Sequence, residues 1–382
     1  MYRILYLLGN QPDNLGDFIQ NLNIIRTFQH LGEVIVDDHY LNNKQIKELG
    51  LSDRNLLSRN ASLSNLRKFS GLVKIALSRS RPYHIILRVP TAREFKYDIK
   101  TVIRELKLLL VLALLHFKKI KIYQFGMTCD SSKLRGILLQ IVRIQSKLHD
   151  IYAVRDINLY HKLKALRFDN IYYCPDIFYW DWNVCSGRTP NITQMEYRNR
   201  TILFSLRRRL PDHPNPLEFE RKLREKVKAI IDSLSEDIRI VFSYQVPEDY
   251  EWNRFLFENY KGRYNCEFVN YCLTKEMADD LYSNCDLIIS NRQHCLLYGA
   301  KLGTPIMALT DPKVHWKLRG ALEDLNVIEF LADINDDNAS VIKKCHILLQ
   351  RKIAISEKLL TAVEKKKEEA ARFLREQVGL EI

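Results

Sequence analysis

The chain has 382 residues, more than the roughly 250–300 at which one hydrophobic core stops growing, so two domains are expected. With 46% hydrophobic and 27% charged residues, burial of apolar side chains alone can stabilise these cores, without disulfide bonds or structural metal ions. The 59 Lys and Arg against 46 Asp and Glu leave a net charge of +13, and no nucleic-acid-binding motif accompanies this excess. We therefore expect a small anion, a membrane surface or solvent to face it, and no nucleic acid.

The first half alternates short β-rich runs with amphipathic helical stretches. Strands are predicted at residues 3–8, 33–37, 83–89, 119–125, 151–154 and 171–174, and helices at 17–31, 63–78, 99–116 and 132–148. This βαβ rhythm is typical of a doubly wound parallel sheet, in which ligands bind at the carboxyl ends of the strands.

The longest apolar run, residues 108–117, is too short for the ~20 residues that a membrane span needs, so a buried helix is expected. Lys118, Lys119 and Lys121 follow it, which leaves a peripheral membrane contact open. The amino terminus enters a strand almost at once, unlike a signal peptide. The eight cysteines form no C-x-x-C pair. We expect reduced thiols, no zinc site and a cytoplasmic location, with the inner face of the membrane as one option.

Residues 186–199 are polar, aperiodic and contain Gly187 and Pro190, so we interpret them as a linker. It separates an N-terminal domain, residues 1–185, from a C-terminal domain, residues 200–382. The second domain repeats the rhythm, with strands predicted at 201–206, 238–243, 266–269, 287–290 and 306–309, a helix at 217–234 and a long terminal helix at 340–377. The expected fold is α/β, with two Rossmann-like domains that face each other across a cleft.

Polar residues follow two predicted strands of the first domain. Asn14 and Asp17 lie where the loop after the first strand enters a helix. They can shape the turn and cap the helix, or they can approach a ligand. Arg155 follows the strand at 151–154, where it can bind an anion or form a structural ion pair. Both alternatives stay open for each position.

The most informative motif follows the strand at 287–290, where the chain continues as Asn-Arg-Gln-His. Arg292 and His294 should stand at the carboxyl end of this strand, beside the amino terminus of a helix. This arrangement suits an anion clamp next to a titratable acid or base. Lys313 and Lys317 follow the next strand, near the same rim.

In this order, the motifs resemble the polysaccharide pyruvyl transferase family. The matching parts are N-x-G-D at 14–17, V-R-D at 154–156, S-L-R at 205–207, R-x-H at 292–294 and L-G-T-P at 302–305, with Lys317 in the block that starts at His315. The resemblance implies a GT-B-like fold, no metal and no dissociable redox cofactor. It also implies transfer of pyruvate from phosphoenolpyruvate to two sugar hydroxyls as a cyclic ketal, in surface polysaccharide biosynthesis such as that of a capsule or exopolysaccharide.

Carried over residue by residue, the resemblance implies a role for each motif. Catalysis is expected from His294 and Arg292, donor binding from Arg155, Arg207, Arg292 and Lys317, and acceptor binding from Asn14 and Asp17. The acceptor would be a glycan precursor, with lipid-linked precursors included. The family's glycine-rich turns are replaced here at 88–91 and reduced at 125–128, which leaves the acceptor open. The alternatives are a GT-B-type glycosyltransferase with a nucleotide-sugar donor and a non-catalytic protein that binds anionic glycans or membranes.

Overall fold

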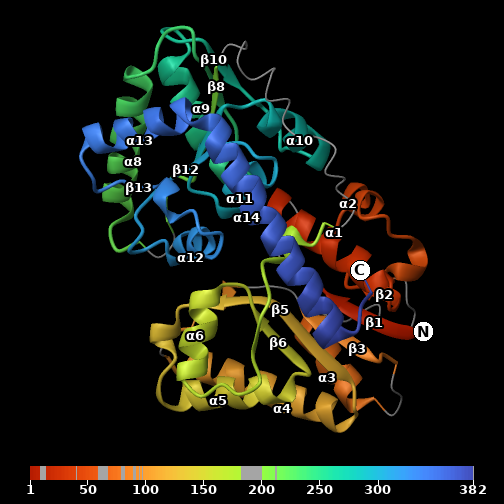
Figure 1. The fold of residues 1–382 in the computed structure, drawn as a ribbon. Coiled ribbons are helices and arrows are strands. Elements are labelled where there is room, and N and C mark those ends of the chain that lie inside the picture. The colour runs from red at the N-terminus through yellow and green to blue at the C-terminus, as the bar shows by residue number, and fades with distance from the viewer. Residues whose placement is uncertain are drawn as a thin grey trace. The chain divides into compact units, whose positions relative to one another are not determined.

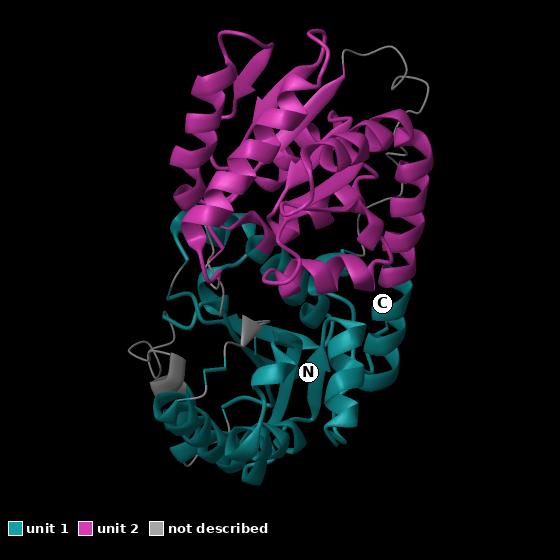
Figure 2. Cartoon of the chain, turned by 90° about the vertical axis from the view of Figure 1, so that its left-hand side faces the viewer, with its two compact units in different colours: residues 1–12, 17–181, 367–382 teal, residues 13–16, 182–366 magenta. Residues whose placement is uncertain are grey.

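The computed structural model describes residues 1–8, 14–39, 41–58, 68–78, 82–88, 92–93, 95–96, 98–181, 200–210 and 213–381. Figure 1 labels most of the helices and strands. The chain divides into unit 1, residues 1–12, 17–181 and 367–382, and unit 2, residues 13–16 and 182–366 (Figure 2). Each unit carries its own parallel sheet with helices, so the predicted two-domain α/β class is confirmed. The predicted linker lies outside the described residues.

Unit 1 has the strand order β2-β1-β3-β5-β6-β7, with the short β4 paired to β5, and all pairings are parallel. Its strands are β1 (Tyr2–Leu7), β2 (Gly32–Val36), β3 (Ile85–Arg88), β4 (Ala92–Arg93), β5 (Lys121–Cys129), β6 (Ile151–Val154) and β7 (Tyr172–Tyr173). Its helices are α1 (Leu15–Gln29), α2 (Asn43–Glu48), α3 (Lys68–Leu77), α4 (Ile99–Phe117), α5 (Gly136–Leu148) and α6 (Ile157–Ala165). The predicted strands are confirmed because near-continuous apolar runs suit strands that are covered on both faces.

Unit 2 has the parallel strand order β10-β9-β8-β11-β12-β13. Its strands are β8 (Thr201–Ser205), β9 (Arg239–Phe242), β10 (Cys266–Phe268), β11 (Leu287–Ser290), β12 (Ile306–Thr310) and β13 (Leu331–Asp333). Its helices are α8 (Pro216–Asp232), α9 (Tyr250–Tyr260), α10 (Lys275–Ser283), α11 (Gln293–Lys301), α12 (Trp316–Asp324), α13 (Asn338–Gln350) and the first part of α14 (Lys352–Phe373). The order reverses between β8 and β11, which marks the switch point where doubly wound folds bind ligands.

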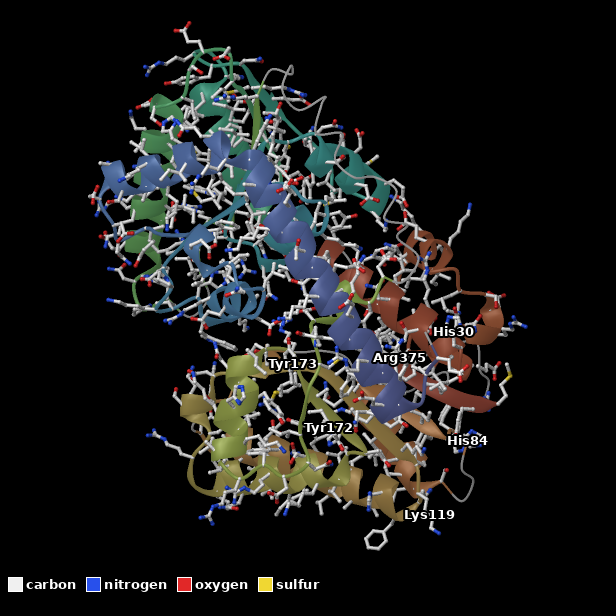
Figure 3. The ribbon with its side chains drawn as sticks, viewed as in Figure 1. His30, His84, Lys119, Tyr172, Tyr173 and Arg375 are labelled. Carbon is white, nitrogen blue, oxygen red and sulfur yellow. The ribbon has the colours of Figure 1, made fainter. Side chains whose placement is uncertain are left out.

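The C-terminal segment differs from its prediction in two ways. The expected single helix at 340–377 is divided at Arg351 into α13 and α14, although neither proline nor glycine marks the break. Residues 367–382 group with unit 1, whereas the expected boundaries assigned them to the second domain. The reason is packing: the Phe373 ring lies 6.0 Å from that of Tyr172, and the hydroxyl of Tyr173 donates to Glu369. Figure 3 labels both tyrosines.

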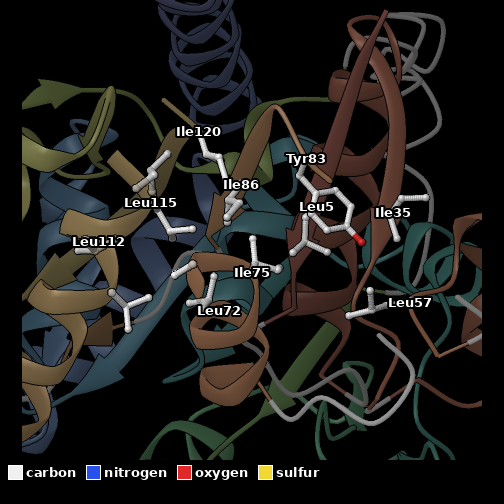
Figure 4. Packing of buried hydrophobic residues seen from close by; sticks show 13 residues of the cluster. Leu5, Ile35, Leu57, Leu72, Ile75, Tyr83, Ile86, Leu112, Leu115 and Ile120 are labelled. Carbon is white, nitrogen blue, oxygen red and sulfur yellow. The ribbon is translucent and has the colours of Figure 1, made fainter. Parts of the chain in front are cut away.

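One hydrophobic cluster of unit 1 lies between its sheet and helices α3 and α4 (Figure 4). Neighbouring strands contribute Leu5, Ile35 and Ile86, and α4 contributes Leu112 and Leu115. All five are almost completely buried. Full burial of such side chains contributes about 1.5–3 kcal/mol each, so this cluster holds α4 firmly against the sheet.

Candidate functional site

Several positive side chains follow the strands that flank the switch point of unit 2. Arg207 comes directly after β8, and Arg292 comes directly after β11. Lys317 lies in the first turn of α12, the helix after β12. Because these three strands are parallel neighbours, their carboxyl ends lie along one edge of the sheet. Unit 2 therefore brings together three of the residues that the sequence singled out for donor binding.

Two buried asparagines fix the backbone at this edge. Asn291 accepts from the N–H of Arg207 at 2.6 Å and donates to its carbonyl at 2.9 Å. Asn253 of α9 does the same for Leu206, at 3.1 and 2.8 Å. Both side chains are almost fully buried, where hydrogen bonds are strong and an unmade one is costly. The loop that carries Arg207 is thus held in one position.

Arg292 is held by a buried ion pair. Its Nε and Nη2 lie 2.6 and 2.5 Å from Oδ2 of Asp249, and the side chains are 11% and 4% exposed. The backbone N–H of Arg292 also donates to Oγ of Ser290. Burial raises the pKa of the Asp249 carboxyl, against the opposing effect of the Arg292 and Arg207 charges. Since α11 begins at Gln293, this guanidinium stands at a helix amino terminus, where anions are favoured.

The electrostatics of the edge are strongly positive. Burial, and then the charge of Arg292, lower the pKa of the Arg207 guanidinium to about 10. Burial, and then the charges of Arg207, Lys317 and Arg292, lower the pKa of the His315 ring to about 3. Nδ1 of His315 lies 3.0 Å from the hydroxyl oxygen of Thr310. Three cations thus act on one neutral imidazole, and we call Arg207, Arg292, Lys317 and His315 the basic cluster.

His294 lies in the first turn of α11, two residues after Arg292. Residues 13–16 group with unit 2, and Gly16 abuts the His294 ring. A Cβ atom at Gly16 would lie 2.1 Å from both Cγ and Nδ1 of that ring, so no other residue fits there without displacement. The N–H of Gly16 donates to the side chain of Asn14, as turn chemistry predicts. Within unit 2, Gly16 of the N-x-G-D motif thus lies against His294 of the R-x-H motif.

The remaining predicted site residues belong to unit 1. Arg155 follows β6 and forms a 3.0 Å ion pair with Asp176, which also accepts from Gln20 at 2.6 Å. This is the structural alternative that the sequence left open. Asp17 lies in the first turn of α1, and its charge adds to burial in raising the pKa of Tyr6. The acceptor role of Asp17 and the donor role of Arg155 stay predictions.

The L-G-T-P segment serves the fold. Gly303 ends α11 in the left-handed region, with φ of +73°. A Cβ there would lie 2.8 Å from Oγ of Ser356 and 3.0 Å from Cγ of Leu360, both in α14. The hydroxyl of Thr304 donates to the carbonyl of Tyr282 at 2.8 Å. These contacts set the turn into β12 and explain why a glycine is needed there.

Sequence reasoning missed two members of the site and undervalued a third. Asp249 lies in a short 3₁₀ turn beyond β9, and Asn253 lies in α9, which the sequence did not predict. Neither belongs to a motif, and only the fold brings Asp249 to Arg292 and Asn253 to Leu206. The sequence motifs give His315 no role, although its position shortly after the strand predicted at 306–309 is a usable signal.

Within the described part of the chain, no helix is long and apolar enough to cross a membrane. No group of three or more His, Cys, Asp or Glu side chains among these residues could hold a metal ion.

The family model for polysaccharide pyruvyl transferases matches residues 14–311. No curated protein matches the chain.

Several solved structures share this fold at low sequence identity. The UDP-GlcNAc 2-epimerase from Neisseria meningitidis bound to UDP-GlcNAc is 11% identical, with a TM-score of 0.59 over 97% of this chain and 100% of that one. The MnaA–UDP co-structure from S. aureus is 12% identical, with 0.60 over 100% and 98%. A glycosyltransferase from Rickettsia africae is 11% identical, with 0.60 over 99% and 98%. They support a GT-B-like fold, and the family match shows that the chain belongs to the polysaccharide pyruvyl transferases.

Proposed function

We propose that this chain transfers the pyruvyl group of phosphoenolpyruvate to two hydroxyls of a sugar in a glycan precursor, forming a cyclic ketal. The observation that carries the proposal is the basic cluster at the switch point of unit 2, where Arg207, Arg292 and Lys317 act on one neutral ring. Phosphoenolpyruvate has a carboxylate and a phosphate attached to the same carbon, and both require cationic partners. A site with three cations and one carboxylate, Asp249, has the positive excess that such a dianionic or trianionic ligand requires.

The cations would have different roles. The ion pair with Asp249 uses Nε and Nη2 of Arg292, which leaves Nη1 to donate to the ligand. Arg207 sits on a backbone that Asn291 holds in place, so it can stabilise charge that builds up on the departing phosphate without reorganising. Lys317 would add a point charge. His315 would stay neutral and act as a hydrogen-bond partner.

The chemistry requires one acid/base group, and we assign it to His294. A proton is added to the methylene carbon of phosphoenolpyruvate, and a sugar hydroxyl bonds to the neighbouring carbon as it gives up its own proton. The bond from that carbon to the phosphate oxygen then breaks, and phosphate leaves with the electron pair. A second hydroxyl bonds to the same carbon and releases its proton to complete the ketal. Imidazole titrates near neutral pH, which suits it to these transfers.

The acceptor is the less constrained substrate. Asn14 and Asp17 are proposed to contact the sugar, and Arg155 an anionic group of a substrate. A lipid-linked precursor at the inner face of the membrane would suit a cytoplasmic enzyme of surface polysaccharide biosynthesis. The contact of Gly16 with His294 supports acceptor binding near Asn14, because a hydroxyl must reach the acid/base group.

Titration calorimetry with phosphoenolpyruvate tests the donor. Lys317→Ala is the informative variant because Arg292→Ala would also leave Asp249 buried without its partner. Loss of a charged hydrogen bond should weaken binding about tenfold or more. Arg319→Ala is the matched control: Arg319 lies two residues further along α12, is 54% exposed and pairs with Glu323.

The rival is a glycosyltransferase, for which the same cations would hold the diphosphate of a nucleotide sugar. Two of the structural neighbours are complexes with UDP-GlcNAc or UDP, so UDP-GlcNAc is the comparison ligand. Binding of phosphoenolpyruvate that weakens in Lys317→Ala and not in Arg319→Ala supports pyruvyl transfer. Binding of UDP-GlcNAc with no response to phosphoenolpyruvate would replace the proposal by the rival.

A further inference from the structure

Helix α4 has apolar side chains on two opposite faces. One face, with Leu112 and Leu115, is buried in the cluster described above. The other face is exposed, and its large apolar residues recur every three or four positions, which places them in one row along the helix. We call this row the α4 stripe; it consists of Ile99, Ile103, Leu106, Leu110, Leu114 and Phe117.

The exposure of the α4 stripe is large. Phe117 is 86% exposed, Ile99 70% and Leu110 65%. Single exposed apolar residues are ordinary on protein surfaces, but a row along a 19-residue helix forms a contiguous patch. An outward-facing surface helix normally carries polar residues on this side. The stripe therefore needs a partner.

Neighbouring helices extend the patch. At the end of α4, Lys118 donates to the carbonyls of Ile75 and Ser78, which places Leu77 of α3, 68% exposed, beside that end. Along its side, Gln145 of α5 donates to the carbonyl of Glu105. Helix α5 adds two exposed isoleucines one heptad apart, Ile137 and Ile144.

The charges around the stripe are mainly positive. From residue 96 to residue 121 the chain has seven Lys and Arg and two acidic residues, Asp98 and Glu105. Asp98 caps the first turn of α4 by accepting from the N–H of Thr101. Glu105 is 2% exposed and pairs with Arg104. Lys100, Lys107 and Lys119 are exposed, and Figure 3 labels Lys119 just beyond the end of α4. A surface with an apolar row and a mainly basic border complements a partner that is apolar within and anionic at its surface.

We propose that the α4 stripe docks on the surface of an anionic lipid bilayer. The apolar side chains would enter the boundary between headgroups and acyl chains, and the lysines would meet the anionic headgroups. The helix would lie in the plane of the membrane surface. The proposal does not depend on which group the enzyme transfers.

Sedimentation of the full chain with lipid vesicles tests the proposal. The protein should bind vesicles of phosphatidylcholine that contain about 30 mol% phosphatidylglycerol. It should bind vesicles of phosphatidylcholine alone more weakly. Leu110→Ser/Phe117→Ser should lower the partition coefficient by about 100-fold, roughly tenfold for each side chain. Lys107→Gln/Lys119→Gln should lower it on anionic vesicles and reduce its salt dependence.

Leu217→Ser is the matched control, because Leu217 of α8 is 66% exposed against 65% for Leu110 and lies outside the patch. It should bind vesicles like the unsubstituted chain. Absence of binding to anionic vesicles, or equal binding by Leu110→Ser/Phe117→Ser, overturns the proposal. Light scattering provides a second check. If the unsubstituted chain is a dimer and Leu110→Ser/Phe117→Ser is a monomer, the stripe is the contact with a second copy of the chain, and the proposal is overturned. The vesicle assay contains no donor or acceptor, so its result is independent of the proposed reaction.

Discussion

The charge state of His315 provides a direct test of the basic cluster. In the folded chain its pKa is lowered to about 3, from an ordinary value of 6.5, first by burial and then by Arg207, Lys317 and Arg292. The ring is therefore neutral at pH 7 in both the folded and the unfolded chain, and the shift has no effect on stability there. As the pH falls below about 6.5, the unfolded chain binds a proton that the folded chain does not, so stability is lost.

The size of this loss follows from the two pKa values. Once the pH is well below 6.5, each further pH unit lowers the free energy of unfolding by about 1.4 kcal/mol. Summed over the range from pH 7.5 to pH 5.0, the loss is about 2 kcal/mol. His315→Gln keeps a polar group beside Thr310 and does not titrate. The difference in free energy of unfolding between the variant and the unsubstituted protein should therefore shift by about 2 kcal/mol in favour of the variant over this range.

Urea unfolding at the two pH values measures this difference for the transition of unit 2. Histidine-selective nitrogen NMR measures the charge state of the ring, with His315→Gln to assign the signal. His30→Gln is the control, because His30 is exposed in unit 1 and labelled in Figure 3. A ring that titrates near 6.5, or a stability difference that does not change with pH, would refute the inference that the charges of Arg207, Arg292 and Lys317 act on His315.

Three further predictions concern His294, Gly16 and Gly303. His294→Ala should abolish phosphate release from phosphoenolpyruvate in the presence of an acceptor while calorimetry still detects donor binding; unchanged turnover would remove His294 from the mechanism. Gly16→Ala places a methyl group on the His294 ring and should lower kcat at least tenfold with little change in donor affinity, which steady-state kinetics and calorimetry separate. Gly303→Ala combines a φ of +73° with a contact of 2.8 Å to Ser356, so it should destabilise unit 2 by about 1–3 kcal/mol, and an unchanged thermal midpoint would contradict this.

The sheet and the cations of unit 2 could be predicted from sequence because both depend on local pattern. A short apolar run followed by a turn predicts a parallel strand, and residues directly after it must stand at the ligand-binding edge. Arg207, Arg292 and Lys317 all follow such runs. Their convergence needed only the assumption of a doubly wound sheet, and the structure confirms that sheet.

The features that escaped prediction depend on tertiary packing. Asp249 has no motif, and its role appears only when its turn is brought to Arg292. The division at Arg351 occurs between residues of good helix propensity, so no local rule marks it. The grouping of residues 367–382 with unit 1 rests on contacts of Phe373 with rings far away in sequence. None of these can be read from periodicity.

Asn253 and Asn291, which bind the backbone just beyond β8, have a consequence for how the sheet ends. Each pairs its side-chain amide with the N–H and the carbonyl of one backbone residue, so each acts as one more rung after the strand has stopped. A rung made by a side chain cannot slide by one register, because only that residue supplies it. Replacing Asn291 by Asp would turn its donor into a second acceptor that faces the carbonyl of Arg207. The hydrogen bond to this carbonyl would then be lost at the residue that carries the guanidinium.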